Sequence, residues 1–483
     1  MLRVFLKDSA VYAIPAFVSR GLALILVPLY TRVLSPADYG SLDLLIVFAS
    51  IVNLTIALEV SQGVARFYAS EPEAERKVLY ASSAFWFTVT CYAVFVAVML
   101  FLSGRLAELI MGQAGLLFAF QIGLVYVFVN GIFYLIQNQF RWELRSTHYA
   151  IVSLTMAFVT AGVSVWLAYF LKWGLVGLLV GMLSGSAVGT VLGLWWLRAS
   201  FRFRFSSVQL KEMLRFSTPL VFSGIAVWVS LYVDRMMINH FLTIDEVGLY
   251  GIGHRLASIA TLVMVGFQGA LTPLIYAHYK NPNTPSQLEK IFRFFLLFAL
   301  LMFLFLTLFA SDILVLLTTP AFYGASVVIV FLVPAILLGN MYIFSPGIGI
   351  AKKTYLIVWI NVVGGLVNVG LNYWLIPIFG ITGAGMATML SYGGIFAAYT
   401  LIGQRFYPIS HNWLRIFAAV GLAALIAVLL PLWALSDTIR WIVNVCFLVG
   451  FAISALALGL IRCDEILSGW RLITQRIRLN ASR

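Results

Sequence analysis

The chain of 483 residues is 62% hydrophobic and only 10% charged, with a formal net charge of +13 at pH 7. Soluble domains carry about 25% charged residues, so this composition excludes a soluble enzyme of this size. The apolar runs of 18 or more residues suit membrane-spanning helices, and they lack the alternation of outer-membrane barrel strands. The sequence therefore predicts an all-α, polytopic membrane protein.

About fourteen transmembrane helices are predicted along the chain. The first apolar stretch lacks a small-residue cleavage site, so it is interpreted as a span and not as a removable signal peptide. An even number of spans places both termini on one side of the membrane. In chain order the predicted spans cover residues 9–33, 41–67, 81–103, 116–138, 149–171, 175–197, 217–241, 251–276, 291–310, 327–349, 356–378, 381–404, 416–436 and 440–461.

The distribution of basic residues predicts which side holds the termini. The two termini and every second loop, with the adjoining helix ends, contain 23 of the 31 Lys and Arg residues. The opposite loops contain only four, namely Arg32, Arg105, Lys172 and Arg440. Because cytoplasmic loops are the basic ones, both termini are expected in the cytoplasm. The net charge is thus a topology signal spread over short segments, and no nucleic-acid partner is expected.

Two pairs of short motifs indicate an internal repeat. Leu34–Gly40 and Leu242–Gly248 lie 208 residues apart in equivalent predicted hairpins, and Gly174–Gly177 and Gly380–Gly383 lie 206 residues apart. This offset spans six predicted helices, an even number, so the two halves keep the same orientation. We therefore expect two pseudo-symmetric six-helix lobes, an arrangement in which transporters bind substrate between the repeats.

Four parts are predicted along the chain: an N-lobe over residues 1–200, a linker over 201–216, a C-lobe over 217–410, and two further helices with a cytoplasmic tail over 411–483. The linker alternates apolar and polar residues, as does a short amphipathic helix on the inner leaflet. Thr218 and Pro219 are expected to be the N-cap and the first residue of the next span.

Three stretches point to a known family. They are Pro28–Asp43, Leu210–Pro219, and Val233–Ile238 followed by Val247–Tyr250. They resemble the polysaccharide transporter branch of the multidrug/oligosaccharidyl-lipid/polysaccharide exporter superfamily. The resemblance implies a flippase of the bacterial cytoplasmic (inner) membrane, which moves a polyprenyl-diphosphate-linked oligosaccharide to the outer leaflet by alternating access. Its product would be a surface polysaccharide: the O-antigen of lipopolysaccharide, a capsule or an exopolysaccharide.

The same resemblance implies a site and partners. In lipid-flipping members a basic central cavity holds the diphosphate-sugar, and an added helix pair can border a groove for the lipid tail. The implied partners are the lipid-linked oligosaccharide, membrane lipids, and a polysaccharide polymerase with other assembly proteins.

Ionisable side chains inside the spans are the first candidates for transport, because a charge in hydrocarbon is costly and usually faces a cavity or a partner. Arg20 lies near the middle of the first span and is expected to face a hydrated cavity, or to pair with Glu59 or another acid. Glu59, Gln62 and Arg66 share one helix face that would line the cavity, although Arg66 is close enough to the interface to snorkel. The seven such residues are Arg20, Asp43, Glu59, Arg66, Asp234, Arg235 and Arg255.

The remaining candidates lie in the seventh and eighth predicted spans and in polar stripes. Asp234 and Arg235 near the outer end of the seventh span, and Arg255 in the eighth, are interpreted either as substrate contacts or as a structural Asp234–Arg255 pair. Each stripe either lines the cavity or forms interhelical hydrogen bonds of about 0.6–2 kcal/mol. The stripes comprise Asn130 with Gln137, His254 with Ser258, Thr261 and Gln268, and Asn361 with Asn368 and Asn372.

The sequence contains no motif for catalysis, a cofactor or a metal. There is no Walker A lysine loop, no GxSxG motif and no ligand-spaced set of cysteines, so we expect no enzyme, cofactor or metal. A multidrug or cation antiporter is disfavoured by four intramembrane arginines against three acids, whereas a peptidoglycan-precursor flippase shares nearly every feature. A glycan polymerase or ligase would need a large periplasmic loop, and none is predicted.

Overall fold

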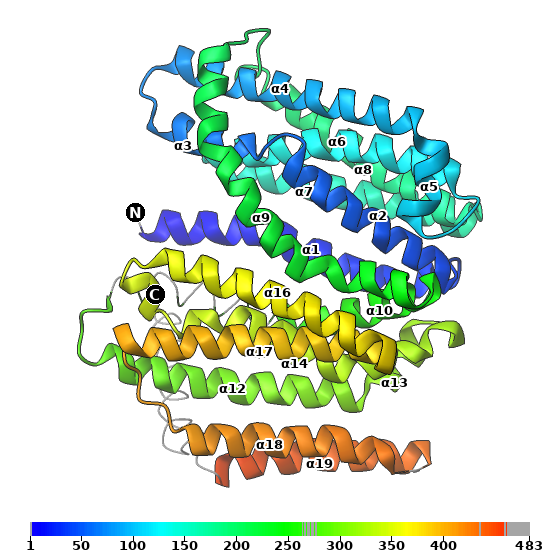
Figure 1. Ribbon diagram of the computed structural model, residues 1–483, viewed down its shortest axis with the longest axis vertical. Helices are drawn as coiled ribbons and strands as arrows, with labels where there is room; N and C mark the ends of the chain where they lie inside the picture. Colours follow the sequence, from blue (N-terminus) through cyan, green and yellow to red (C-terminus); the bar gives the residue numbers. More distant parts are fainter. Residues whose placement is uncertain are drawn as a thin grey trace, which may run out of the picture. The chain divides into compact units, whose positions relative to one another are not determined.

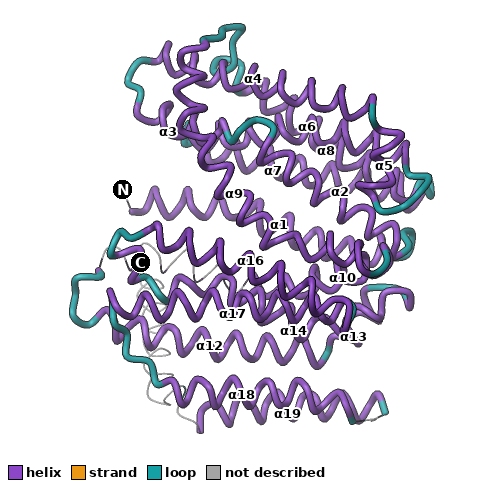
Figure 2. The backbone as a smooth tube through the Cα atoms, in the orientation of Figure 1, coloured by secondary structure: helices purple, strands orange, loops and turns teal. Residues whose placement is uncertain are grey.

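The computed structural model describes residues 2–262, 264, 267, 271, 275, 278–433, 436–457 and 460. Within these residues the regular structure is helical throughout, without a strand (Figure 2). Eleven helical segments of the described chain are long and apolar enough to cross a membrane, and Ile14–Tyr30 and Trp413–Leu429 are shorter apolar helices. The prediction of an all-α, polytopic membrane protein is confirmed.

The described chain forms two compact units, of which the first runs to Ile252 and also contains Val315–Gly324 and Gly365–Ala384. Its helices are drawn from blue to green in Figure 1. They are α1 (Leu2–Tyr30), α2 (Pro36–Thr55), α3 (Val60–Ser70), α4 (Ala74–Phe101), α5 (Ser103–Met111), α6 (Leu117–Trp142), α7 (Ser146–Ser164, continued as a π-helix over Val165–Phe170), α8 (Gly174–Trp196), α9 (Ser207–Phe241) and the start of α10 (Ile244–Ala257).

The second unit begins at Gly253 and contains the described residues that do not belong to the first unit. Helix α16 passes from the second unit to the first between Gly364 and Gly365. The later helices are α12 (Thr284–Leu308), α13 (Ala310–Leu317), α14 (Ser326–Asn340), α15 (Gly347–Ile350), α16 (Thr354–Phe379), α17 (Ile381–Phe406), α18 (Trp413–Leu429) and α19 (Asp437–Ala457), with 3-10 turns at Ser258–Ala260, Pro320–Ala325, Met341–Phe344 and Leu430–Leu432.

Small residues allow the helices of the first unit to pack closely. Helix α8 carries glycine at every fourth position from Gly177 to Gly193, which places these glycines along one face. A Cβ atom on Gly181 would collide with the backbone of Ser164, and one on Gly185 with the carbonyl of Met156. Because apolar burial does not drive association between helices in lipid, such close backbone approach is a main source of stability.

The region predicted as a linker folds differently from the expectation. Its residues from Ser207 onward are the first turns of α9, which continues through Pro219 to Phe241, so the separate interfacial helix and the predicted cap at Thr218 are wrong. Proline removes one helical hydrogen bond and kinks a helix, and Figure 1 shows α9 bending along its length. Membrane helices tolerate proline because neighbouring groups satisfy the freed carbonyl.

The two units do not coincide with the two predicted lobes. Most of α9 and the start of α10 fall within the predicted C-lobe (217–410), yet they are part of the first unit, where α9 packs against α2, α3 and α4. The two six-helix lobes predicted from the repeat remain a prediction. The contact between segments of the two halves is the feature that positions the site.

Candidate functional site

The two turns that the sequence pairs as repeats lie against each other in the first unit. Ser35 caps α2 through a capping box with Asp38, with an Asp38 N to Ser35 Oγ distance of 3.1 Å. A Cβ on Gly40 would collide with the carbonyl of Ile244 in α10, and a Cβ on Gly248 with the carbonyl of Pro36. Both positions therefore require glycine, because two backbones meet there without space for a side chain.

A buried cluster of charges lies close to this contact. Arg235 of α9 forms ion pairs with Asp234 (Nη1 to Oδ1, 3.0 Å) and with Asp43 of α2 (Nε to Oδ2, 3.9 Å). The hydroxyl of Tyr250 on α10 donates a hydrogen bond of 2.6 Å to Asp234 Oδ2. The exposed fractions are 7% for Asp43, 5% for Asp234 and 6% for Arg235. One cluster thus joins three helices, and its residues on α9 and α10 belong to the predicted C-lobe.

The buried charges in this cluster stabilise one another. Taking an ion out of water costs several kcal/mol, which only good pairing and hydrogen bonding offset. The guanidinium of Arg235 lies over the rings of Tyr232 and Tyr250 as well as beside the two carboxylates, and Arg235 donates to the carbonyl of Leu231. We infer that the cluster holds α2, α9 and α10 together at this end.

The cluster differs from the Asp234–Arg255 pair considered in the sequence analysis. Asp234 bonds instead to its neighbour Arg235 and to Tyr250. Adjacent residues on a helix point about 100° apart, yet a long arginine side chain can turn back to reach the preceding carboxylate. The sequence analysis did not include Tyr250 among the site residues. The signal that could have found it is its place in the Val247–Tyr250 motif.

A second feature is a break in the predicted second span. The chain leaves α2 at Thr55 and enters α3 at Val60, with both Leu58 and Glu59 in the left-handed region (φ 49° and 50°). Residues other than glycine pay roughly 1–2 kcal/mol each for this conformation. Glu59 therefore stands at the start of α3, and the expected continuous stripe of Glu59, Gln62 and Arg66 begins at a helix break.

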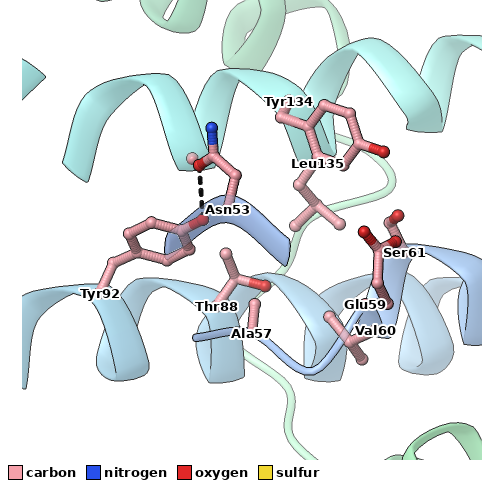
Figure 3. A pocket seen from close by; sticks show the side chains of 10 residues that line it. Asn53, Ala57, Glu59, Val60, Ser61, Thr88, Tyr92, Tyr134 and Leu135 are labelled. Atoms are coloured by element: carbon pink, nitrogen blue, oxygen red, sulfur yellow. Dashed lines mark hydrogen bonds between the residues drawn. The ribbon is translucent and has the colours of Figure 1, made fainter. Parts of the chain in front are cut away.

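The break borders a small pocket inside the first unit (Figure 3). Helices α4 and α6 supply Thr88, Tyr92 and Tyr134, and the Tyr92 hydroxyl donates a hydrogen bond of 2.7 Å to Asn53 Oδ1. Figure 3 places the Glu59 carboxylate beside Ser61 and facing Tyr134. Sequence reasoning found only Glu59 here, although Thr88 and Tyr92, one turn apart on α4, form a polar pair in an apolar span.

The other predicted site residues are distributed over both units. Arg20 on α1 and Arg66 on α3 are exposed, Asn130 on α6 is partly buried, and His254 and Arg255 are partly buried at the end of α10. Asn361 bonds to the carbonyl of Ile357 and to the Tyr399 hydroxyl (2.9 and 3.1 Å), and Gln137 bonds to Ser153 (2.8 Å). These two polar residues therefore make interhelical hydrogen bonds.

Asn368 is buried, and its carbonyl and side-chain oxygens accept hydrogen bonds from the Asn372 amide (2.9 and 3.1 Å). This bond lies within α16 and does not link two helices. Gln268, the last member of the predicted stripe on the eighth span, lies outside the described residues.

A model of the family described as "Polysaccharide biosynthesis protein" matches residues 29–326, more than half of the chain. A search of curated protein sequences finds no match.

Solved structures resemble the whole fold. The lipid II flippase MurJ in an inward closed conformation aligns with a TM-score of 0.67 at 15% identity, covering 91% of this chain and 97% of MurJ. An inward-facing multidrug resistance MATE family transporter of the MOP superfamily aligns with a TM-score of 0.62 at 18% identity, covering 83% and 95%. A mutant of the Vibrio cholerae MATE transporter VcmN gives a TM-score of 0.57 at 14% identity, covering 83% and 97%. The chain therefore has the fold of membrane flippases and transporters.

Proposed function

The chain belongs to the polysaccharide biosynthesis protein family, and we propose that it flips a polyprenyl-diphosphate-linked oligosaccharide from the inner to the outer leaflet. The transported unit would serve the synthesis of a surface polysaccharide: O-antigen, capsule or exopolysaccharide. The fold, which is that of membrane flippases and transporters, supports a transport role and not an enzymatic one. Movement would proceed by alternating access, in which two halves of the molecule open to one side of the membrane at a time.

The contact between the two repeat turns is the observation that carries this proposal. Gly40 and Gly248 bring the turns of the two sequence halves into backbone contact, and Arg235 with Asp43 adds a buried charge pair beside it. A carrier that alternates needs a contact between its halves that is closed in one state and open in the other. Such a contact would be the outer gate, because the distribution of basic residues predicts that both turns lie on the outer side.

The arginines inside the apolar helices indicate a substrate with negative charge. A diphosphate carries about two negative charges, and an Arg guanidinium can bind phosphate with two parallel hydrogen bonds. Arg20 lies exposed on α1, a helix whose part from Ile14 to Tyr30 is apolar. A cation held at membrane depth is costly unless it serves an anion or a water-filled cavity. Arg20 is therefore the residue proposed to contact the diphosphate.

Two alternative substrates are favoured by specific observations. The structural likeness to the lipid II flippase MurJ favours a peptidoglycan precursor, which also carries a diphosphate. The likeness to MATE transporters favours an organic cation. An organic cation calls for an acidic cavity, and the exposed arginines Arg20 and Arg66 argue against it. Since the family is one of polysaccharide biosynthesis, the lipid-linked oligosaccharide is preferred over lipid II.

The location and partners follow from the same proposal. The chain would reside in the bacterial inner membrane with both termini in the cytoplasm, and a polysaccharide polymerase with other assembly proteins would receive its product. Reporter fusions at Lys77 and Arg202 should then be cytoplasmic, and a fusion at Asp245 periplasmic. A cytoplasmic reporter at Asp245 would overturn the assigned orientation.

The function is tested in cells that lack the protein. We expect the lipid-linked oligosaccharide to be made and to accumulate, while the surface polysaccharide is lost, and expression of the chain should restore both. Accumulation is measured by mass spectrometry of extracted lipids. If the cells accumulate a peptidoglycan precursor instead and lyse, the chain is a precursor flippase and the proposed substrate is wrong.

A further inference from the structure

The pocket at the α2–α3 break contains polar atoms that no other group satisfies within the described residues. Glu59 Oε2 and Thr88 Oγ1 are both buried there without a hydrogen-bond partner in that part of the chain. Thr88 is 2% exposed, and Ser61, which also lines the pocket, is 4% exposed. Because buried polar groups are almost always paired, two unpaired oxygens aimed at one pocket call for a bound species.

We propose that this pocket binds one monovalent cation, a proton or a sodium ion, whose charge neutralises Glu59. Glu59 is the single charged residue among those that line the pocket; the others are Asn53, Ala57, Val60, Ser61, Thr88, Tyr92, Gly131, Tyr134 and Leu135. Nothing among them compensates the negative charge of a deprotonated carboxylate. A single positive charge would make the site neutral and thereby remove the cost of a buried anion.

The size of the pocket restricts its occupant. The space available to a water-sized particle is about 20 Å³, and a site for one water needs at least about 10–15 Å³. A sugar or a diphosphate is therefore far too large. Glu59, considered above as a substrate-cavity residue, is accordingly assigned to an ion and not to the glycan.

The groups around the pocket suit a proton or a hard cation. A carboxylate and hydroxyl oxygens are ligands that hard cations prefer, and transporters use carbonyls of unwound helix segments for sodium and proton sites. The backbone is unwound here, since Leu58 and Glu59 occupy the left-handed region between α2 and α3. The titratable groups that face Glu59 are Tyr92 from α4 and Tyr134 from α6, and α9 contributes no residue to the lining.

The position of the pocket connects it to the outer contact. Helix α2 carries Asp43 of the buried charge cluster near its start and ends at Thr55, where the pocket begins. Occupancy of the pocket would fix the break that follows α2, while the ion pair of Asp43 with Arg235 fixes the other end of α2. On the proposed flippase function, the ion would thus bias the gate that α2 helps to close, and its gradient would contribute to driving transport.

Binding is tested on the purified full chain in nanodiscs, without any lipid substrate. If sodium is the ion, replacing choline chloride by sodium chloride at about pH 8 should raise the Tm of the wild type by about 2–5 °C. Glu59→Gln should abolish the shift, because the neutral amide mimics the occupied site. Thr88→Val keeps the shape of the side chain and should weaken sodium affinity roughly tenfold. The control is Glu108→Gln, which alters an exposed glutamate on α5 and should keep the full Tm shift.

If the proton is the ion, sodium has no effect, and infrared difference spectra between about pH 9 and pH 5 should show a protonated carboxyl shielded from water. That band should be absent in Glu59→Gln, retained in Glu108→Gln and shifted in Thr88→Val. Absence of both the sodium shift and the band would overturn the proposal. These readouts involve no flipping, so a chain that binds the ion but moves no lipid overturns the flippase and leaves the ion site standing.

Discussion

Replacing Arg20 by alanine is expected to reduce export of the surface polysaccharide at least tenfold while the protein still inserts and accumulates. Arg20 is exposed on α1, so its loss removes no buried packing. Hydrogen bonds to charged groups are worth about 1.5–3 kcal/mol, and this range corresponds to a roughly 10- to 150-fold loss of substrate stabilisation. Export is measured by surface staining, and protein amount by immunoblotting of membranes.

Two further variants make this result specific. Arg20→Lys should retain part of the activity, because lysine keeps the charge but loses the two-pronged geometry. Arg105→Ala is the matched control, since Arg105 is an exposed arginine on α5 in the same unit, and it should export at the wild-type level. Wild-type export by Arg20→Ala would mean that Arg20 does not contact the diphosphate.

Replacing Arg235 by alanine is expected to cost about 3–5 kcal/mol of stability, because the substitution leaves Asp43 and Asp234 buried without their guanidinium. Such a loss is large for a folded domain, so most of the protein should aggregate or be degraded. The measurement is the Tm and the monodisperse fraction of the purified chain in detergent.

The matched control is Asp43→Asn, which removes the longer of the two ion pairs of Arg235. Asp43→Asn abolishes the charge of the 3.9 Å pair but leaves the 3.0 Å pair of Asp234 and Arg235 intact and neutral overall. We expect Asp43→Asn to cost clearly less than Arg235→Ala. Equal stability of Arg235→Ala and the wild type would show that the cluster does not hold α2, α9 and α10 together.

The helices followed from the sequence for physical reasons, whereas the contact between the two repeat turns did not. Apolar length alone determines which segments can span a bilayer. The equivalence of Gly40 and Gly248 was visible in their spacing, and in the structure each requires glycine because of the same backbone contact. The spacing thus identified the two equivalent glycines but not that their turns touch.

Two local features escaped prediction because packing overrides propensity. Residues 55–59 contain neither glycine nor proline, yet the helix breaks there with Leu58 and Glu59 left-handed. Conversely, Pro219 is a strong signal for a helix start, but α9 continues through it. Both cases depend on neighbouring helices, which are not visible in one segment of sequence.

The candidate site was only partly predictable. Charged residues in apolar spans identified Asp43, Glu59, Asp234 and Arg235, because charge in hydrocarbon is rare. Sequence spacing does not reveal that Arg235 turns back onto Asp234 or that Tyr250 completes the cluster. The polar lining of the pocket from Thr88 and Tyr134 likewise requires the packing of α4 and α6 against the break.

Transmembrane movement of lipid in proteoliposomes tests the central claim most directly. Vesicles containing the purified chain and a fluorescent polyprenyl-diphosphate-linked oligosaccharide are exposed to a membrane-impermeant reagent that destroys the label in the outer leaflet. We expect the wild type to make nearly all of the label accessible, whereas Arg20→Ala should leave about half protected, as protein-free vesicles do. Protection of half the label with the wild type, together with uptake of an organic cation by the same vesicles, would show that the chain transports cations and is not a flippase.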